Sequence, residues 1–219
     1  MVELRMTADG SNTVFSDAFS ETYHSVNGAV TESKHVFIDA GLKSCSKKHI
    51  RIFEVGFGTG LNALLSIIEG QKQNLVIDYH SVELYPIDMS MVEQINYPDF
   101  LSSEIKLFKS MHEASWDAPV PIVSGFRLKK MNAGIREVSL TEKYDVVFFD
   151  AFSPAVQPDL WTADIFRKLY KHTAEGGVLT TYCAKGEVRR TMVASGFTVE
   201  RLPGPPGKRE MLRATKNAL

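Results

Sequence analysis

The feature that most constrains the fold is an apolar run that passes through closely spaced glycines into a second apolar run, HIRIFEVGFGTGLNALLSIIEG, at residues 49–70. Its first part predicts a buried strand at residues 50–55, and the part after the glycines predicts a helix at residues 61–69 that ends at Gly70. The next run, NLVIDYHSVELYP, predicts a strand that ends near Glu83. A strand, a helix and a strand in succession indicate a parallel sheet.

The later part of the chain continues this alternation. A strand at residues 144–150 is followed by a helix at about 158–172, and the last two strands flank PGPPGKR, which indicates an antiparallel hairpin. The fold class is therefore α/β, a doubly wound and mainly parallel sheet with an antiparallel C-terminal hairpin. The other expected elements are strands at 126–132, 176–183, 197–202 and 210–215, and helices before Tyr97, around 102–111 and at 184–195.

Length and composition set the domain organisation. With 219 residues, 44% of them hydrophobic, the chain is expected to form one domain, residues 46–219, preceded by an N-terminal extension, residues 1–45, that covers one edge of the sheet or the site. No apolar run reaches the length of a membrane span, and the start of the chain lacks the apolar stretch of a signal peptide. We expect a cytoplasmic protein without membrane contact.

The cysteines and histidines do not indicate a metal site. Cys45 and Cys183 are far apart in the sequence, and the six histidines are scattered, so the clustered spacing of a zinc site is missing. We expect free thiols and no bound metal.

The charge is unevenly distributed along the chain. Residues 185–219 hold eight basic and three acidic side chains, a net charge of +5, while the whole chain carries −1 and the remainder therefore −6. Such a basic segment is typical of a surface that contacts a polyanion. Ordinary scatter of surface charge explains so short a segment equally well.

The glycine turn EVGFGTG carries the first functional signal. Gly56, Gly58 and Gly60 stand where a strand turns into a helix, and the absence of Cβ atoms allows both the tight turn and the close approach of a ligand. The helix N-terminus beyond them favours a negatively charged ligand group. A plain tight turn is the alternative reading of a lone glycine-rich loop.

The spacing of this turn differs from the dinucleotide fingerprint. It reads G-x-G-x-G, and Glu54 precedes the first glycine by two positions, as in the class I S-adenosylmethionine-dependent methyltransferases, which the stretch resembles. Glu83 follows Gly60 by 23 residues, at the end of the next strand, where a carboxylate can accept both ribose hydroxyls. We include Phe57, as apolar lining, and Asn62 among the cofactor-binding residues.

A second signal lies in YDVVFFDAFSPAVQPDLW, where a buried strand stops at Asp150. Ligands of open α/β sheets bind beyond the carboxyl ends of the strands, so Asp150 is expected at the cofactor pocket, on a strand next to the first one. Pro154 and Pro158 stiffen the following loop and hold Phe152 and Trp161 as walls. Alternatively, Asp150 caps the next helix or binds loop amides.

Four stretches together identify a more specific resemblance. The chain resembles the methyltransferase half of the MnmC family of tRNA 5-methylaminomethyl-2-thiouridine synthesis proteins, whose stand-alone form is called MnmD. The stretches are SDAFSETYHSVNGAVTESKHVF at 16–37, EVGFGTGLN at 54–62, FFDAFSPAVQPDLW at 148–161 and YCAKGEVRRTMVASGFTVERLPGPPGKREML at 182–212.

This resemblance implies methyl transfer from S-adenosyl-L-methionine to the aminomethyl nitrogen on C5 of the wobble uridine or 2-thiouridine of tRNA. It does not imply the flavin-dependent oxidase activity of the bifunctional proteins, so no flavin is expected. The implied partner is the anticodon arm of tRNA, and the sequence does not indicate whether the chain is a monomer or a dimer.

The resemblance also implies roles for individual residues. Asp150 binds and orients the amine while water takes the proton, and Tyr23 or Glu32 completes the pocket. Related sequences carry an acid in a GD pair that contacts adenine, but this chain reads MNAGIREV there, and Asn132 is the expected substitute because its carbonyl oxygen accepts from an amino group. On the RNA side, the base stacks on Phe152, beside Pro154, and Phe57 is the competing stacking candidate. The expected phosphate contacts are Arg189, Arg190, Lys208 and Arg209.

Three other functions stay open on the sequence alone. An aminopropyltransferase of the polyamine synthase type uses a related fold and a strand-end aspartate, although such enzymes place several acids around a polycationic amine. A small-molecule methyltransferase needs the same cofactor motif. A non-catalytic tRNA-binding module is disfavoured by the intact glycine turn, Glu83 and Asp150.

Overall fold

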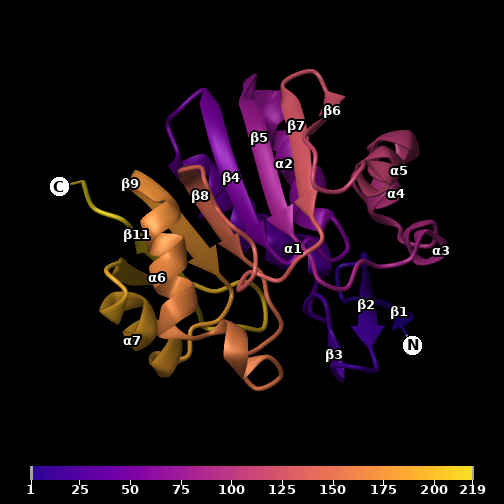
Figure 1. Ribbon diagram of the computed structural model, residues 1–219. Coiled ribbons are helices and arrows are strands. Elements are labelled where there is room, and N and C mark those ends of the chain that lie inside the picture. The colour runs from indigo at the N-terminus through magenta and orange to yellow at the C-terminus, as the bar shows by residue number, and fades with distance from the viewer. Residues whose placement is uncertain (1, 219) are drawn as a thin grey trace.

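The computed structural model describes residues 2–218, and within them one mixed sheet of eight strands forms the centre of the protein (Figure 1). The strand order is β10-β11-β9-β8-β4-β5-β7-β6. The strands are β4 (His49–Val55), β5 (Val76–Val82), β6 (Val120–Val123), β7 (Phe126–Met131), β8 (Tyr144–Phe149), β9 (Thr173–Thr181), β10 (Thr198–Pro203) and β11 (Glu210–Thr215).

The pairing confirms the expected fold class. β4 runs parallel to β5 and to β8, β5 parallel to β7, and β8 parallel to β9, while β10 and β11 form the expected antiparallel hairpin. Strand β6, which the sequence analysis did not predict, pairs antiparallel with β7 at the other edge. It is four residues long and contains Pro121, which removes a hydrogen-bond donor and suits only an edge strand.

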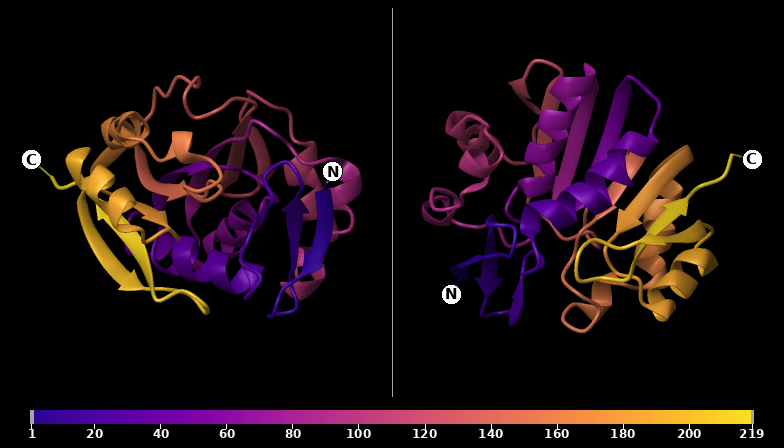
Figure 2. Two further views of the ribbon diagram at one scale, coloured as in Figure 1. Left: turned by 90° about the horizontal axis from the view of Figure 1, so that it is seen from below. Right: turned by 180° about the vertical axis from the view of Figure 1, so that it is seen from behind.

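Helices cover both faces of the sheet, as a doubly wound fold requires (Figure 2). On one face lie α2 (Leu61–Gln73) and α5 (Ile105–Glu113), and on the other lie α6 (Ala163–His172) and α7 (Gly186–Ala194). Figure 2 (left), seen from below, looks toward the ends of the central strands, with the C-terminal hairpin on one side and the N-terminal strands on the other.

Alternating side chains of the central strands fill two cores. Ile52 of β4 and Phe148 of β8 pack in the core beneath α2, whereas Phe53 and Phe149 pack beneath α6. Because both faces of these parallel strands are buried, their sequences read as continuous apolar runs.

Helix α2 is longer than predicted. It passes through Gly70 and ends at Gln73, with Asn74 in the left-handed conformation at φ 52°. Gly70 is a packing position rather than a stop signal, because a Cβ there would lie 2.9 Å from Cδ1 of Ile77 on β5. The expected helix end at Gly70 is therefore wrong.

The segment between β5 and β6 is mostly irregular. The helix expected before Tyr97 is the single turn α3 (Met89–Val92), and a second turn, α4 (Tyr97–Phe100), follows it. Helix α5 matches the one expected around residues 102–111.

The N-terminal region has a structure of its own. It contains a small antiparallel sheet, β1 (Val2–Met6), β2 (Asn12–Ser16) and β3 (Glu21–Thr22), and then the turns α1 (Ala29–Ser33), η1 (Lys34–Asp39) and η2 (Leu42–Ser44). Phe37 and Leu42 are buried in the same core as Ile52, so this region packs against the sheet. A boundary at residue 45 stays a prediction.

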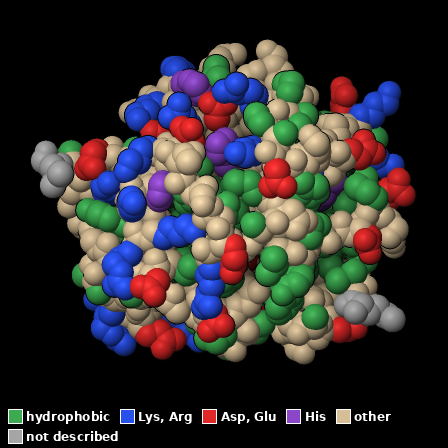
Figure 3. Space-filling model, in the orientation of Figure 1, with side chains coloured by type: hydrophobic (Ala, Val, Ile, Leu, Met, Phe, Trp, Pro, Cys, Tyr) green, Lys and Arg blue, Asp and Glu red, His purple; other side chains and the backbone are tan. Residues whose placement is uncertain are grey.

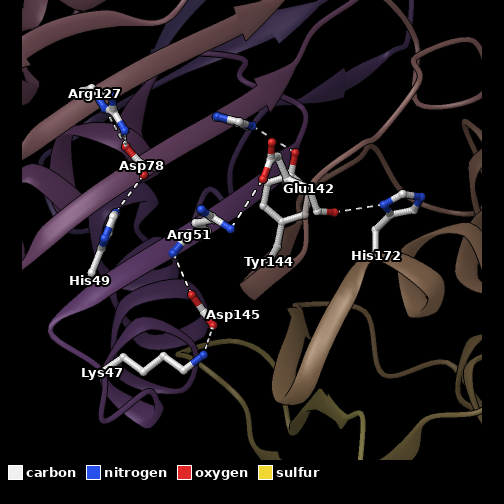
Figure 4. Close-up of polar contacts among 10 residues, drawn as sticks. Lys47, His49, Arg51, Asp78, Arg127, Glu142, Tyr144, Asp145 and His172 are labelled. Atoms are coloured by element: carbon white, nitrogen blue, oxygen red, sulfur yellow. Dashed lines mark hydrogen bonds and ion pairs between the residues drawn. The ribbon is translucent and has the colours of Figure 1, made fainter.

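The amino ends of the central strands carry a network of ion pairs (Figure 4). Asp78 on β5 accepts from His49 at 2.8 Å and from Arg127 on β7 at 2.7 Å. Asp145 at the start of β8 accepts from the backbone N–H of Arg51 and from Lys47. These contacts tie four neighbouring strands and their approaching loops together at this edge of the sheet.

On the face seen in the orientation of Figure 1, basic and hydrophobic side chains gather in different places. Figure 3 shows basic side chains of this face mainly on its left half, over α6 and α7 and over the upper ends of β4 and β8, and hydrophobic side chains at its lower right. Across residues 2–218, no helix combines the length and the apolar character needed to span a bilayer.

Candidate active site

One cavity of about 350 Å³ lies at the carboxyl ends of the central strands. Val55 of β4, Glu83 after β5 and Asp150 after β8 all line it, and the backbone joins these tips: Asp150 N–H donates to Val55 O and Gly56 N–H donates to Val82 O. The convergence of three strand tips expected from the sequence is thus confirmed. The volume suits a nucleotide-sized ligand.

The glycine turn adopts a conformation that other residues rarely reach. Gly56, Gly58 and Gly60 have φ values of 92°, 50° and 73°. A Cβ on Gly56 would lie 2.6 Å from the carbonyl oxygen of Asp150, closer than any real contact. Glycine at position 56 therefore brings the turn against the Asp150 strand and leaves a cradle for a ligand.

Glu83 is held by the turn itself. Its Oε2 accepts from the N–H of Gly58 at 2.9 Å and its Oε1 from the N–H of Tyr85 at 2.8 Å. Burial raises the pKa of Glu83, and the backbone hydrogen bonds oppose that rise. The carboxylate lines the cavity with lone pairs left to accept ligand hydroxyls, as expected for a ribose.

Two carboxyl groups share one amide at the base of the cavity. Asn62 Nδ2 donates to Glu54 Oε1 at 3.0 Å and to Asp150 Oδ2 at 2.8 Å. Glu54 is fully buried, also accepts from Ser81 at 2.8 Å, and does not line the cavity. It supports the site from beneath rather than contacting the ligand space.

Burial dominates the electrostatics of both acids. It raises the pKa of Asp150 to about 7, against the opposing hydrogen bond from Asn62. It likewise raises the pKa of Glu54 to about 8, and the nearby charge of Asp150 adds to that rise. Asp150 is therefore a carboxyl group that gains or loses its proton near neutral pH, which suits acid-base chemistry.

The N-terminal region supplies one wall of the cavity. Tyr23 packs on the glycine turn, where a Cβ on Gly58 would lie 3.0 Å from its ring. Burial, with the charge of Glu83, raises the pKa of Tyr23 to about 12, so its hydroxyl keeps its proton. His24 also lines the wall, bonds Thr59 at 2.7 Å, and is kept neutral by burial, which lowers its pKa to about 4.

Aromatic rings close the mouth beside this wall. Phe152 stacks on Phe19 with ring centroids 4.6 Å apart, and Tyr23 meets Phe152 edge-on at 5.0 Å. Trp161 is buried and donates its Nε1–H to Phe152 O at 2.8 Å, so it fixes the loop rather than facing the ligand. One face of Phe152 is thus already covered by a protein ring.

Several expected site residues lie outside the lining of the cavity. Asn132 is exposed, and the residues that follow it, 133–137, line the cavity instead. Pro154 and Gly60 also lie outside the lining, whereas Phe57 and Asn62 belong to it.

Glu32 and Lys208 are brought together from opposite ends of the chain. They form an ion pair in which the Glu32 side chain is 8% exposed and the Lys208 side chain 31% exposed. Neither lines the cavity. Glu32, expected to complete the pocket, is paired with Lys208 instead of lining the cavity, and contact of Lys208 with phosphates stays a prediction.

The remaining three basic candidates are unpaired. Among the residues that the structure describes, Arg189, Arg190 and Arg209 form no ion pair. Arg190 and Arg209 are exposed, and Arg189 is half-buried. Their contact with phosphates stays a prediction.

Acidic groups that the sequence analysis missed lie at the cavity. Glu137 and Asp159 join Glu83 and Asp150 in the lining, where Arg136 is the one guanidinium among the described residues. No motif marked Glu137, which lies in an irregular segment; Phe19, His24 and Asp159 did lie in stretches that carried the family resemblance. Within residues 2–218, no cluster of His, Cys, Asp and Glu is arranged to hold a metal ion.

Comparison with known proteins agrees with this geometry. Residues 124–217 match the family model Methyltransf_30, described as S-adenosyl-L-methionine-dependent methyltransferase. The chain is also 32% identical over 230 residues to the tRNA 5-methylaminomethyl-2-thiouridine biosynthesis bifunctional protein MnmC of Azoarcus sp. (strain BH72). That alignment covers 96% of this chain but 35% of the relative, so the chain spans about a third of the relative's length.

Solved structures show the same fold. A crystal structure of MnmC2 from Aquifex aeolicus superposes with a TM-score of 0.83 at 28% identity, covering 100% of this chain and 71% of that one. A spermidine synthase from Thermotoga maritima has a TM-score of 0.59 at 15% identity, covering 99% of this chain and 69% of that one, which indicates a shared fold alone.

Proposed function

The chain belongs to the S-adenosyl-L-methionine-dependent methyltransferases and is related to MnmC, and on this premise we propose its substrate. It acts as an N-methyltransferase on the 5-aminomethyl group of wobble uridine or 2-thiouridine in tRNA and yields the corresponding 5-methylaminomethyl nucleoside, which is 5-methylaminomethyl-2-thiouridine when the substrate is thiolated. The observation that carries the proposal is Asp150, a carboxyl group with a pKa of about 7 beside the glycine turn.

The residues at the cavity fit the cofactor of this family. S-adenosyl-L-methionine, when bound, supplies an electrophilic methyl group on a sulfonium. Gly56 and Gly58 leave the backbone open to a close ligand, and Glu83 offers carboxylate oxygens for ribose hydroxyls. Phe57, 4% exposed, supplies an apolar wall.

The charge of the cavity suits a cationic guest. Among the described residues, the lining contains four carboxyl groups and one guanidinium, that of Arg136. The carboxyl groups are those of Glu83, Glu137, Asp150 and Asp159. Both a sulfonium and an aminomethyl group, which is protonated at neutral pH, are cations. Carboxylates within hydrogen-bond reach attract such groups and place them.

Asp150 then prepares the amine. Its Oδ2 accepts from Asn62, which leaves Oδ1 to accept a proton from the substrate ammonium. Deprotonation frees the nitrogen lone pair, and the walls formed by Tyr23 and Phe152 restrict its direction. Tyr23 does not act as the base, because its pKa is raised to about 12 by burial.

The RNA lies along the basic C-terminal segment. The unpaired Arg189, Arg190 and Arg209 contact phosphates of the anticodon arm, and the target base enters at the aromatic mouth of the cavity. The first 45 residues serve as the cover of the site, since Phe19, Tyr23 and His24 line it.

In vitro methylation tests the proposal. Purified protein is incubated with S-adenosyl-L-methionine carrying a labelled methyl group and with tRNA that bears 5-aminomethyl-2-thiouridine, and digested nucleosides are analysed by mass spectrometry. We expect a mass increase of one methyl group on that nucleoside alone.

Two controls complete the assay. Unmodified tRNA of the same sequence should remain unlabelled, and so should putrescine offered with decarboxylated S-adenosylmethionine. Transfer to putrescine and not to tRNA would instead assign the chain to the aminopropyltransferases.

A further inference from the structure

The ion pair of Glu32 and Lys208 is connected to Asp150 by a series of direct contacts. Lys208 Nζ lies 4.0 Å from the centroid of the Tyr182 ring. The Tyr182 hydroxyl donates to the carbonyl oxygen of Ala151 at 2.8 Å, next to Asp150 in the chain. A cation in the loop between β10 and β11 is thus tied to the tip of β8.

The other member of the pair is tied to the N-terminal wall of the cavity. Glu32 Oε1 accepts from the backbone N–H of Ser25 at 3.1 Å, directly after the lining residue His24. A second contact joins the N-terminal region to the C-terminal hairpin: Nε2 of His35 forms a hydrogen bond with the carbonyl oxygen of Pro203 at 2.8 Å. The pair therefore joins the cover of the site to the C-terminal hairpin, behind the Asp150 loop.

Glu32 lies too far inside the protein to be an incidental surface group, and Lys208 is half-buried beside it. The Glu32 side chain is 8% exposed. Exposed ion pairs contribute little, whereas a charge removed from water is costly unless its partner compensates it. Removal of either partner leaves an uncompensated charge near the cavity.

Few other charges act on Asp150 at neutral pH. Burial raises the pKa of Tyr79, Tyr97 and Tyr182, so these hydroxyls are neutral, and it raises the pKa of Glu54 to about 8. Glu32 and Lys208 act on Asp150 in opposite directions, the acid raising and the lysine lowering its pKa. The titratable groups that interact with Asp150 are Glu54 on β4, Tyr79 on β5, Tyr97 on α4, Tyr182 after β9, Glu32 on α1 and Lys208 in the last loop.

We propose that Glu32 and Lys208 are positioning residues for methyl transfer: as a compensated pair they hold Tyr182 against the Asp150 loop and balance the charge beside Asp150. Neither touches the substrate. The inference rests on the proposed function in naming Asp150 as the group that receives the proton. On this proposal Lys208 does not contact tRNA phosphates. The residues proposed to contact them are Arg189, Arg190 and Arg209.

The test follows the titration of Asp150 itself. The carboxyl carbon of Asp150, labelled with ¹³C and assigned with Asp150→Asn, is titrated by NMR in the protein without RNA. Lys208→Met should move its midpoint to higher pH, because a compensating cation is lost. Glu32→Gln should move it to lower pH, and the double variant should lie between the two, near the wild type.

A matched pair elsewhere in the chain provides the control. Lys216 forms an ion pair with Glu175 at 3.1 Å, and its Nζ lies 5.0 Å from the centroid of the Tyr170 ring. These residues repeat the combination of lysine, glutamate and tyrosine in another part of the chain. Lys216→Met and Glu175→Gln should leave the Asp150 midpoint where it is. Thermal melting of every variant reports loss of packing separately from the titration.

The outcomes separate this inference from the proposed function. Opposite shifts with compensation in the double variant support the pair. Unchanged midpoints, or shifts of both single variants in one direction, overturn it, because distortion of the loop has no reason to follow the sign of the charge. Methylation of tRNA by the wild type is a separate measurement, so its failure would count against the proposed substrate and leave the titration result intact.

Discussion

The amide nitrogen of Asn62 lies 2.8 Å from Oδ2 of Asp150, and its second hydrogen goes to Glu54. This arrangement fixes the orientation of the amide, because its oxygen would otherwise face a carboxyl group. It also restrains a carboxyl group whose pKa burial raises to about 7. Asp150 is thus oriented before any substrate arrives.

Asp150→Asn should therefore abolish proton acceptance while preserving shape. We expect methyl transfer to fall by about a hundredfold or more, the scale of a positioned acid-base group. Binding of S-adenosyl-L-methionine, measured by calorimetry, should stay close to the wild type. A variant with near-normal kcat would remove Asp150 from the chemistry.

The pH dependence of the wild-type reaction follows from the same residue. The ionised form of Asp150 accepts the proton, so kcat/KM should rise with pH through a value near 7, where burial places the Asp150 pKa. In Asp150→Asn this step should be missing from the profile. The measurement is kcat/KM for methyl transfer by both proteins in a series of buffers of different pH and constant ionic strength.

Glu83→Ala should weaken cofactor binding. Hydrogen bonds to a charged group contribute about 1.5 to 3 kcal/mol, so the Kd for S-adenosyl-L-methionine should rise by about tenfold or more. Glu137→Ala is the control, since this exposed acid lines the same cavity without bonding the glycine turn. Equal effects of the two changes would contradict a specific role for Glu83.

Gly56→Ala should destabilise the fold and the cofactor site together. The new methyl group would lie 2.6 Å from Asp150 O, on a backbone with φ 92°. We expect a loss of about 1 to 3 kcal/mol or more in the free energy of unfolding, from strain and crowding. Gly176→Ala isolates the backbone effect, because φ there is 73° and nothing lies within 4 Å; chemical denaturation should show the smaller loss.

Arg189→Glu with Arg190→Glu should weaken tRNA binding through charge. If both side chains contact phosphates, the slope of log affinity against log salt should become shallower by about 2. Lys48→Glu with Lys72→Glu, at the opposite ends of β4 and α2 from the cavity, is the matched control. Binding measured at several salt concentrations distinguishes them, and equal slopes would place the RNA elsewhere.

Asp78→Asn should lower stability without touching the site. Burial raises the pKa of Asp78, but hydrogen bonds from His49 and Arg127 outweigh it and lower the pKa overall. The stabilisation is therefore present above the unfolded value of about 3.9 and is lost as pH falls through the folded-state pKa. Denaturation at neutral pH should show a loss of about 1 to 3 kcal/mol. Asp164→Asn, at a pair on the surface, should change little.

The sequence predicted those parts of the site that sit at the ends of buried strands. Apolar runs that stop at Gly56, Glu83 and Asp150 predict both the strands and the side of the sheet where these residues meet, because parallel strands present their carboxyl ends on one side. Local pattern was enough there. Trp161, expected as a wall of the site, is instead buried and bonded to the loop backbone.

Other parts depend on contacts that no local pattern encodes. The strand β1 alternates between half-buried and exposed residues and resembles a polar segment, so the N-terminal sheet was not predicted. Asn132 was placed by analogy with an acid in related sequences, but the irregular backbone after β7 directs residues 133–137 to the cavity. Basic residues near Lys208 look alike in sequence, and only tertiary structure shows which one is paired.

The partnership of Glu32 with Lys208 joins positions that are 176 residues apart. The ion pair therefore forms only when the N-terminal region and the C-terminal hairpin have both folded against the sheet. A chain reduced to residues 124–217 would contain Lys208 without Glu32, and its lysine would lack this partner.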